Sequence, residues 1–518
     1  MARNQHFMKH LLFTHLKLSA LLFVFFPGFA QQQKPQQPNI IIFLVDDMGW
    51  QDTSVPFYNE RTPQNNKFAT PNMERLANRG MKFTHAYANQ NCTPSRISIM
   101  TGLNVISHHV TTWTLNKNEN SEPDVLGIIQ PAWNKNGFSN IPGYENAIHA
   151  TALPQLLKDN GYATIHIGKA HFGSFDTPGA DPKNLGFEVN IGGTAAGHPA
   201  SYYGQKNFGN TPGMKNIRAV PGLEKYWGQD IFLTEALTRE AIREVDQVRE
   251  NKKPFFLHLS HYAVHTPIVA DKRFVQRYYD RGLDTIEANY ASLVEGMDKS
   301  LGDIMNYLDE KKIADNTVII FMSDNGGLTD VARGTGRNAH NAPLRSGKTS
   351  GYEGGIRIPL IFYWPTVTAA ASINEGNVIV EDIFSTVASL AGIKKPATIQ
   401  HVTGIDFSWY VKKNQKLPSR YLTWHYPHAH EGRHGDVQPF SIIREGKWKL
   451  IYFHRDGHFE LYDTERDISE SNNLIEVEKE NAKALAKELG KLLRNQKAPR
   501  PIVASTGAVV PYPDEIMK

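Results

Sequence analysis

The residues around the single cysteine have the types and the spacing of an anion-binding site. Cys92 opens the run Cys92-Thr-Pro-Ser-Arg96, and Thr101-Gly102 follows soon after. Pro94 is typical of the first turn of a helix, which would place Cys92 at a helix N-terminus. The free N–H groups and the dipole at such an end favour an anion. With the cation of Arg96 close by, the run indicates a reactive thiolate in an anion site.

A lone cysteine also has a plainer interpretation. Cys92 is the only cysteine of the 518 residues, so the chain has no internal disulfide. Such a cysteine is most often a small buried hydrophobic residue. In an exported chain, however, an unpaired thiol needs an explanation, and the neighbours of Cys92 favour a chemical one.

Oxygen-bearing side chains follow two of the predicted strands. Asp46-Asp47 come directly after the run 39–45, and Asp324-Asn325 come after the run 317–322. Each pair alone is also typical of a helix cap or an Asn-Gly turn. Together, three carboxylates and an amide at the carboxyl ends of parallel strands predict a site for a hard cation. No Cys/His cluster occurs in these motifs, which disfavours zinc.

Four cationic or titratable residues follow strands or lie in glycine-rich turns. Lys169 and His171 follow the run 163–167, His265 follows the run 255–259, and Lys348 lies in a stretch rich in glycine. A lone lysine is usually a solvated surface charge, and a lone histidine is often just packed. Their convergence beside a predicted metal favours a functional role.

The elements that must position these residues alternate between strands and helices. Continuous apolar runs rich in β-branched residues indicate buried strands at 39–45, 163–167, 255–259 and 317–322. Helical patterns lie between them at 152–160, 231–249 and 286–308. The alternation predicts an α/β fold with a large, mostly parallel sheet sandwiched by helices. Long loops at 104–150 and 172–225 are expected to shape a pocket.

The chain is predicted to have four parts. Residues 1–30 read as a signal peptide, 31–38 as a linker, 39–405 as the catalytic domain and 406–518 as a small α+β subdomain. The last part shows a hairpin at 441–452 that turns at Glu445-Gly446, a strand at 459–462 and a helix at 477–494, which predicts a short antiparallel sheet and a helix.

The N-terminal segment predicts export to the periplasm or the medium. Three basic residues precede the apolar run 18–26, which is too short for a stable membrane anchor, although a signal anchor is the alternative. Without residues 1–30 the chain has 53 basic against 52 acidic residues. This balance argues against nucleic-acid binding. No stable membrane association is expected after cleavage.

The motifs resemble the type I sulfatase family of the alkaline-phosphatase-like superfamily. Its signature Cys-x-Pro-Ser-Arg with a later Thr-Gly matches 92–96 and 101–102, and its Gly-Lys-x-His, His-x-Pro and Gly-Lys…Tyr-Glu-Gly-Gly-x-Arg-x-Pro elements match 168–171, 265–267 and 347–359. The resemblance implies that a maturation enzyme converts Cys92 to 3-oxoalanine (formylglycine). It further implies one Ca²⁺ bound by Asp46, Asp47, Asp324, Asn325 and residue 92. His261 is a poorer candidate than His265, which alone precedes x-Pro.

The resemblance also implies roles in the hydrolysis of a sulfate monoester. Hydrated formylglycine would attack sulfur, while Ca²⁺, Arg96, Lys169 and Lys348 neutralise the sulfuryl oxygens. His265 would protonate the leaving alcohol, with Lys348 as a possible partner, and His171 would deprotonate the second hydroxyl to expel sulfate.

Two other functions remain open from the sequence. One is a phosphate or phosphonate ester hydrolase on the same fold, and the other is a non-catalytic protein that binds sulfated glycans, if Cys92 is not oxidised. Export and aromatic-rich loops favour a sulfated polysaccharide or oligosaccharide as substrate: an algal polysaccharide such as ulvan or carrageenan, or a host glycan.

An aromatic and histidine-rich run at 423–430, extended by Arg433 and His434, begins the C-terminal part. It has two interpretations of about equal weight. One is a structural cluster at the domain interface. The other is a sugar-binding rim in which Trp424 or Tyr426 stacks on a ring while His425 and His428 bond its hydroxyls.

Overall fold

Strand β1 (Asn39–Val45) lies inside the main sheet because it is apolar on both of its faces. Its side chains alternate between two separate cores. Ile40, Ile42 and Leu44 face one core, and Ile41, Phe43 and Val45 face the other. A strand with this pattern must be covered by helices on both sides, as the sequence predicts. The computed structural model describes residues 37–333, 340–430 and 437–517, so the predicted signal peptide and most of the linker lie outside the described residues.

The main sheet has nine strands in the order β11-β2-β10-β9-β1-β8-β6-β7, with β12 beside β2. Within the described residues, β10 is the strand that runs antiparallel to its neighbours, and the other pairings are parallel. The fold is therefore the α/β arrangement with a mostly parallel sheet. Its remaining strands are β2 (Met81–Tyr87), β6 (Ala163–Gly168), β7 (Val189–Ile191), β8 (Phe255–Ser260), β9 (Thr317–Ser323), β10 (Arg357–Tyr363), β11 (Ser372–Asn374) and β12 (Val378–Ile379).

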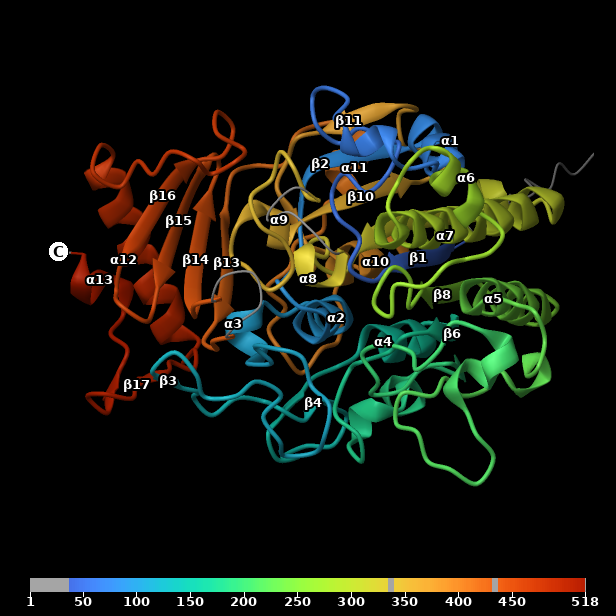
Figure 1. The fold of residues 1–518 in the computed structure, drawn as a ribbon, viewed down its shortest axis with the longest axis horizontal. Helices are drawn as coiled ribbons and strands as arrows, with labels where there is room; N and C mark the ends of the chain where they lie inside the picture. The colour runs from blue at the N-terminus through green and yellow to red at the C-terminus, as the bar shows by residue number, and fades with distance from the viewer. Residues whose placement is uncertain (1–36, 334–339, 431–436, 518) are drawn as a thin grey trace, which may run out of the picture. The chain divides into compact units, whose positions relative to one another are not determined.

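Helices cover both faces of this sheet (Figure 1). One face is covered by α1 (Pro71–Arg79), α5 (Leu233–Arg249), α6 (Val275–Asp280) and α7 (Thr285–Glu310). The other is covered by α2 (Cys92–Thr101), α4 (Leu153–Asp159) and α10 (Asp382–Leu390). The three helices predicted at 152–160, 231–249 and 286–308 are thus confirmed as α4, α5 and α7, with ends shifted by a few residues.

A second, four-stranded antiparallel sheet follows in the C-terminal part, drawn in orange-red in Figure 1. Its strands lie in chain order: β13 (Tyr421–Tyr426), β14 (Phe440–Glu445), β15 (Trp448–Phe453) and β16 (Phe459–Asp463). The predicted hairpin is confirmed, since β14 and β15 pair and only Gly446-Lys447 join them. Helix α12 (Lys479–Asn495) packs on this sheet through a third core. Residues from Gln37 onward cluster as one compact unit, so the domain boundary at 405 stays a prediction.

The long loops contain only short elements. The first holds α3 (Val105–His108), β3 (Ile128–Ile129), β4 (Gly137–Ser139) and β5 (Ala147–His149). Short segments elsewhere are α8 (Asp330–Arg333), α9 (Glu353–Ile356), α11 (Ser408–Lys413), β17 (Ile502–Val503), β18 (Ala508–Val509) and α13 (Pro513–Ile516). Both loops contribute residues to the large cavity described below.

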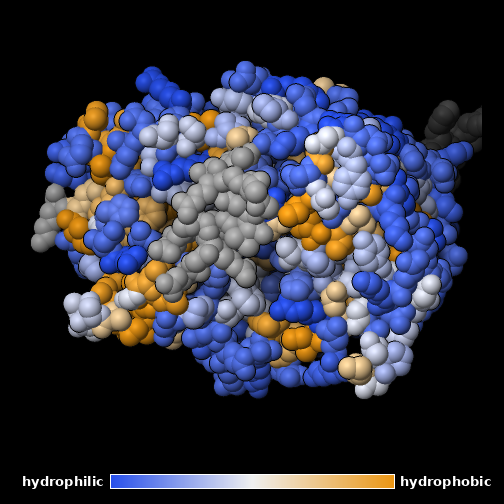
Figure 2. Space-filling view, in the orientation of Figure 1, coloured by the Kyte–Doolittle hydropathy of each residue, from blue (hydrophilic) through white to orange (hydrophobic). Residues whose placement is uncertain are grey.

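The face seen in Figure 2 is mostly hydrophilic, with apolar patches that are small and separate. This agrees with the placement of the large aliphatic and aromatic side chains in the three cores. Across the part of the chain that the structure describes, we find no helix with the length and apolar character needed to cross a membrane.

Candidate active site

The predicted site residues gather at one edge of the main sheet. Asp46 and Asp47 follow β1, Asp324 follows β9, Lys169 follows β6 and His265 lies just after β8. These four strands are parallel neighbours, so their carboxyl ends meet at the same edge. In α/β sheets this edge is where ligands bind.

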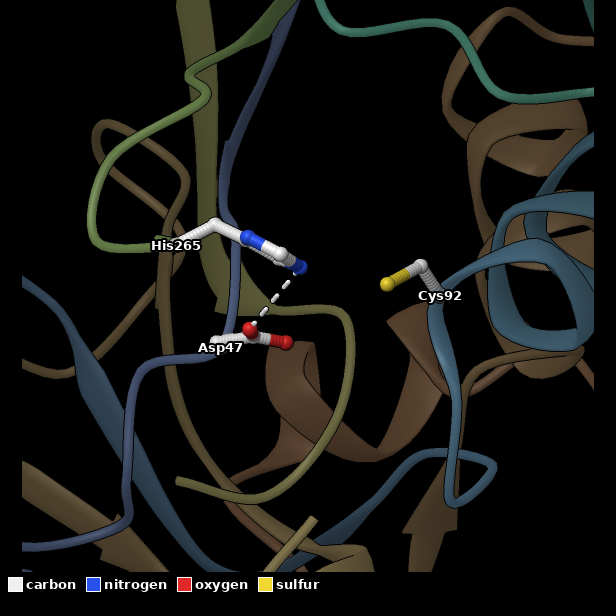
Figure 3. A group of neighbouring side chains, drawn as sticks. All are labelled: Asp47, Cys92 and His265. Carbon is white, nitrogen blue, oxygen red and sulfur yellow. Dashed lines mark ion pairs between the residues drawn. The ribbon is translucent and has the colours of Figure 1, made fainter. Parts of the chain in front are cut away.

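Helix α2 presents Cys92 to this edge. The helix begins at Cys92, with Asn91 as its extended N-cap, which confirms the predicted helix N-terminus. It ends at Gly102, whose φ of 68° is the left-handed conformation that favours glycine at a helix C-terminus. Figure 3 shows the side chain of Cys92 pointing from α2 toward Asp47 and His265. The ligand atoms of these three side chains lie within 4.8 Å of one another.

Three carboxylates and an amide lie fully buried beside the cysteine. The backbone N–H of Asp47 donates to Asp324 Oδ1 at 3.2 Å. Asn325 Nδ2 donates to Asp47 Oδ1 at 2.8 Å. The Asn325 Oδ1 atom is buried and has no hydrogen-bond partner among the described residues. An unpaired buried amide oxygen is costly, which marks this atom as a free acceptor for a cation.

Each of the three carboxylates is paired with a different cation. Lys169 Nζ lies 2.7 Å from Asp46 Oδ2, and Lys348 Nζ lies 2.6 Å from Asp47 Oδ1. The third pair joins Arg96 Nη2 to Asp324 Oδ2 at 2.8 Å. The charges are therefore compensated locally, as buried ions require. Burial raises the pKa of Asp46 while the neighbouring Lys169 lowers it, and Lys348 is the main influence that holds the pKa of Asp47 below its usual range against burial.

Cys92 is a neutral thiol in this setting. Its Sγ atom lies 3.5 Å from Lys348 Nζ and 3.7 Å from Asp46 Oδ1, and its exposed fraction is 3%. Burial raises the pKa of the thiol to about 12, and the neighbouring lysines lower it only in part. The expectation of a reactive thiolate is therefore wrong for the unmodified residue, because desolvation outweighs the nearby cations.

Two histidines, His171 and His265, lie near Cys92 and make different hydrogen bonds. His171 Nε2 lies 2.8 Å from the Thr114 carbonyl, which can only accept, so this nitrogen carries the proton. Its Nδ1 is buried without a partner among the described residues, so its lone pair is free. His265 Nε2 lies 3.4 Å from Asp47 Oδ2 (Figure 3). Burial lowers the pKa of both imidazoles well below the ordinary value.

His261, the poorer candidate in the sequence, is absent from this group. It is fully buried, its Nε2 bonds Ser300 Oγ at 2.8 Å, and its ring packs against Phe43. This placement makes it a packing residue.

A cavity of about 900 Å³ opens over the cysteine. Cys92, His171, His265 and Lys348 line it, together with residues that the sequence did not single out. These come from the two long loops, from the segment before α9, and from the C-terminal sheet with its β15–β16 turn: Trp113, Glu122, His198, Arg218, Arg345, Tyr352, Phe440, Phe453, His458 and Glu460. Tyr352 falls inside the 347–359 motif, which therefore indicated it, while Arg345 lies two residues before that motif. The sequence predicted that the loop at 172–225 shapes a pocket, but it did not indicate Arg218.

The predicted sugar-binding rim is corrected by the structure. Trp424, His425 and His428 each have an exposed fraction of 0%, and none of them lines the cavity. Trp424 Nε1 donates to the Ala88 carbonyl, His425 bonds Ser441 and the Pro499 carbonyl, and His428 bonds Thr111 and Gln130. These residues join β13 to neighbouring segments, because buried polar groups must find partners. Arg433 and His434 lie outside the described residues, while His430 from the same run does line the cavity.

Comparisons with known proteins agree with this fold. A family model described as Sulfatase matches residues 38–393, and a model described as N-sulphoglucosamine sulphohydrolase, C-terminal, matches residues 347–498. A sulfatase of Formosa agariphila is 28% identical over 92% of each chain. An N-acetylgalactosamine-6-sulfatase of Mus musculus is 30% identical over 78% of this chain and 70% of its own.

Solved structures show the same likeness. The crystal structure of Ps i-CgsB in complex with k-i-k-neocarrahexaose matches with a TM-score of 0.69 at 28% identity, over 89% of this chain and 94% of that chain. The chain belongs to the sulfatase family, on the alkaline-phosphatase-like fold. It is an enzyme of the sulfuric ester hydrolase class.

Proposed function

We propose that this chain removes O-sulfate groups from a sulfated oligosaccharide or polysaccharide, with formylglycine formed from Cys92 as the nucleophile. The placement of Cys92 carries the proposal. It lies at the N-terminus of α2, at the base of a cavity of about 900 Å³. Three cations lie beside it, and two histidines, His171 and His265, line the same cavity. A neutral, buried thiol is a weak nucleophile. Conversion to an aldehyde, whose hydrate has two hydroxyls, gives this position the chemistry that the thiol lacks.

The acidic cluster fits a calcium ion. Asp46, Asp47, Asp324 and Asn325 offer only oxygen atoms, which hard cations prefer, and Asn325 Oδ1 is an acceptor without a partner among the described residues. Together with residue 92 these side chains would hold Ca²⁺. When bound, the ion would supply positive charge against the sulfuryl oxygens.

The chain's own cations would bind the same sulfuryl oxygens. Lys169, Lys348 and Arg96 already surround Cys92 through their carboxylate partners. Fixed cations in a buried site stabilise the charge that develops on the sulfuryl oxygens more strongly than water does. Their arrangement before substrate arrives means that little reorganisation is needed during the reaction.

The two histidines would move protons in separate steps. His265 faces the cavity beside Cys92 and would give a proton to the alcohol oxygen as its bond to sulfur breaks. His171, with its free Nδ1, would take the proton from the second hydroxyl of residue 92. Loss of that proton restores the aldehyde and breaks the bond between residue 92 and the sulfate. General acid–base help of this kind is worth about 10²–10⁴-fold.

The cavity and the relatives support a carbohydrate substrate. Aromatic side chains, histidines and arginines line a space large enough for more than one sugar ring. One relative is named for N-acetylgalactosamine-6-sulfate, and one similar structure holds a neocarrahexaose. We therefore propose sulfated galactans and glycosaminoglycans as the substrate class of this chain. Export to the periplasm or the medium and maturation by a formylglycine-generating enzyme complete the proposal.

The test is turnover of 4-nitrophenyl sulfate by Cys92→Ala and Cys92→Ser, with intact-mass analysis of the wild type. We expect both variants to fold and to lose turnover, and the wild-type mass to show the aldehyde or its hydrate. Activity near wild type in Cys92→Ser would contradict the formylglycine chemistry. Faster turnover of a phosphate ester would favour the phosphatase alternative, and an unmodified thiol without turnover would favour a binding protein.

A further inference from the structure

The cavity contains an arginine that the proposed reaction does not use. Arg218 lies in the long loop at 172–225 and lines the cavity with Cys92 and His265. One of its N–H groups donates from Nη1 to His198 Nε2. Across the described ranges, no carboxylate lies at ion-pair distance from its guanidinium, and burial alone lowers its pKa. A half-buried cation without an acidic partner is costly unless a ligand supplies the missing charge.

His198 holds this arginine as a fixed hydrogen-bond acceptor. Its Nδ1 lies 3.2 Å from the Pro199 carbonyl and therefore carries the proton, which leaves Nε2 to accept from Arg218. The His198 ring also stacks on the His265 ring, with centroids 5.6 Å apart and planes 16° from parallel. Through these contacts Arg218 is anchored on the side of the cavity where His265 would meet the leaving alcohol.

The other charged residues of the cavity wall are already paired. Arg345 lies 4.0 Å from Glu460, donates to Tyr462 and stacks on Tyr352. Of the two lining glutamates, Glu460 bonds Tyr352 and Tyr462, while Glu122 bonds Trp113 and His430. Arg345 has two hydrogen bonds, to Tyr462 and to the Glu470 carbonyl, and an ion pair with Glu460. Arg218 has one hydrogen bond, to His198, so four of its five N–H donors have no partner among the described residues.

We propose that Arg218 binds a second anionic group of the substrate, on the sugar that leaves or on its neighbour. This inference rests on the proposed function. The sulfate that is cleaved is already surrounded by Lys169, Lys348 and Arg96, so Arg218 is available for another group. A guanidinium fork pairs well with the parallel oxygens of a sulfate or a carboxylate. The preferred substrate is therefore a glycan that carries at least two anionic groups, and Arg218 is a specificity-determining residue.

The test measures binding of disaccharide pairs to the full chain in calcium buffer, using Cys92→Ala so that nothing is cleaved. The two members of each pair, of galactan or glycosaminoglycan type, differ by one additional sulfate. We expect the disulfated member of at least one pair to bind about 10- to 100-fold more tightly by calorimetry, the range for a hydrogen bond between charged groups. Adding Arg218→Gln should remove this preference, while Arg218→Lys keeps part of it.

Lys215→Gln is the matched control. Lys215 is exposed in the same loop and does not line the cavity, so its loss removes the same charge without touching the ligand. The preference should survive in this variant. An unchanged preference in Arg218→Gln, or no pair with a preference, would overturn the inference. The proposed function would still stand if the wild-type chain releases sulfate from these disaccharides. Failure to bind any sulfated disaccharide would overturn the inference and the proposed function together.

Discussion

At the scale of residues, the site is built from opposite charges that compensate one another. Asp46 with Lys169 and Asp324 with Arg96 form ion pairs between side chains that are 0% exposed. Removal of one partner from such a pair leaves an uncompensated charge in a low-dielectric interior. Variants at these positions would therefore change stability and activity together. The histidines are better probes, because their replacement leaves these ion pairs in place.

We predict that His171→Ala and His265→Ala each lower kcat on a sulfated sugar by about 10²–10⁴-fold. They should differ on 4-nitrophenyl sulfate, whose leaving group needs no proton. There, turnover by His265→Ala should recover in large part. His171→Ala should stay slow and accumulate enzyme sulfated at residue 92, visible by intact mass.

His261→Gln is the control for these two variants. Its side chain bonds Ser300 away from the cavity, so its replacement should cost stability and spare turnover. Equal recovery of His171→Ala and His265→Ala on the aryl sulfate would contradict the division of roles between the two histidines.

At the scale of elements, β13 joins the C-terminal sheet to the rest of the chain through buried polar side chains. His425 lies on this strand and is bonded through both ring nitrogens, to Ser441 Oγ at 2.8 Å and to the Pro499 carbonyl at 2.7 Å. Burial lowers its pKa to about 4, so the folded state holds it neutral. The unfolded chain would bind a proton near pH 6.5.

We predict that His425 makes the protein less stable as the pH falls below about 6.5. Between this value and about pH 4 the unfolded state binds the extra proton, so the free energy of unfolding falls with pH. The loss from this residue at about pH 5 is on the order of 2 kcal/mol. In His425→Gln, the difference in unfolding free energy between about pH 7.5 and pH 5 should shrink by that amount, measured by urea denaturation. An unchanged difference would contradict the depressed pKa.

Strand β15 carries a buried charge that reaches the segment next to Lys348. Lys449 Nζ lies 3.1 Å from Glu353 and 2.7 Å from Glu470, and all three side chains are fully buried. Glu353 begins α9, a few residues after Lys348. The small sheet thus supports the backbone that presents a site lysine.

We predict that Lys449→Met lowers the free energy of unfolding by about 3–5 kcal/mol, because it leaves Glu470 without its buried cation and leaves Glu353 with only Arg357 and Arg444. Lys447→Met is the matched control, since Lys447 pairs with Asp463 at 2.7 Å but is 34% exposed. Its cost should stay below about 1 kcal/mol. Similar midpoints of urea unfolding for the two variants would contradict the importance of the buried pair.

At the scale of the whole molecule, the proposed calcium site joins the ends of β1 and β9 to the start of α2. A ligand that binds only the folded chain stabilises all of it. We therefore predict that a chelator lowers Tm and turnover together, and that added Ca²⁺ restores both. Asn325→Ala, which removes an oxygen ligand, should need more Ca²⁺ for the same shift. Restoration by zinc alone, or an unchanged Tm, would contradict the site.

Local pattern in the sequence was enough to predict much of this protein. Continuous apolar runs predicted β1, β6, β8 and β9, and the turn at Glu445-Gly446 predicted the hairpin, because both depend on neighbouring residues. The strand ends then predicted where Asp46, Lys169, His265 and Asp324 would meet. Parallel strands bring their carboxyl ends to one edge, so order along the chain implied proximity in space.

Other features were decided only by the tertiary structure. Lys348 bonds Asp47 across 301 residues and Arg96 bonds Asp324 across 228, and nothing in the local sequence states which cation meets which carboxylate. The run from Trp424 to His428 has the same composition whether it lines a cavity or fills an interface. Burial depends on the segments that pack against a residue, and these come from distant parts of the chain. For the same reason Arg218 became a candidate only when the fold placed it beside His198 and the cavity.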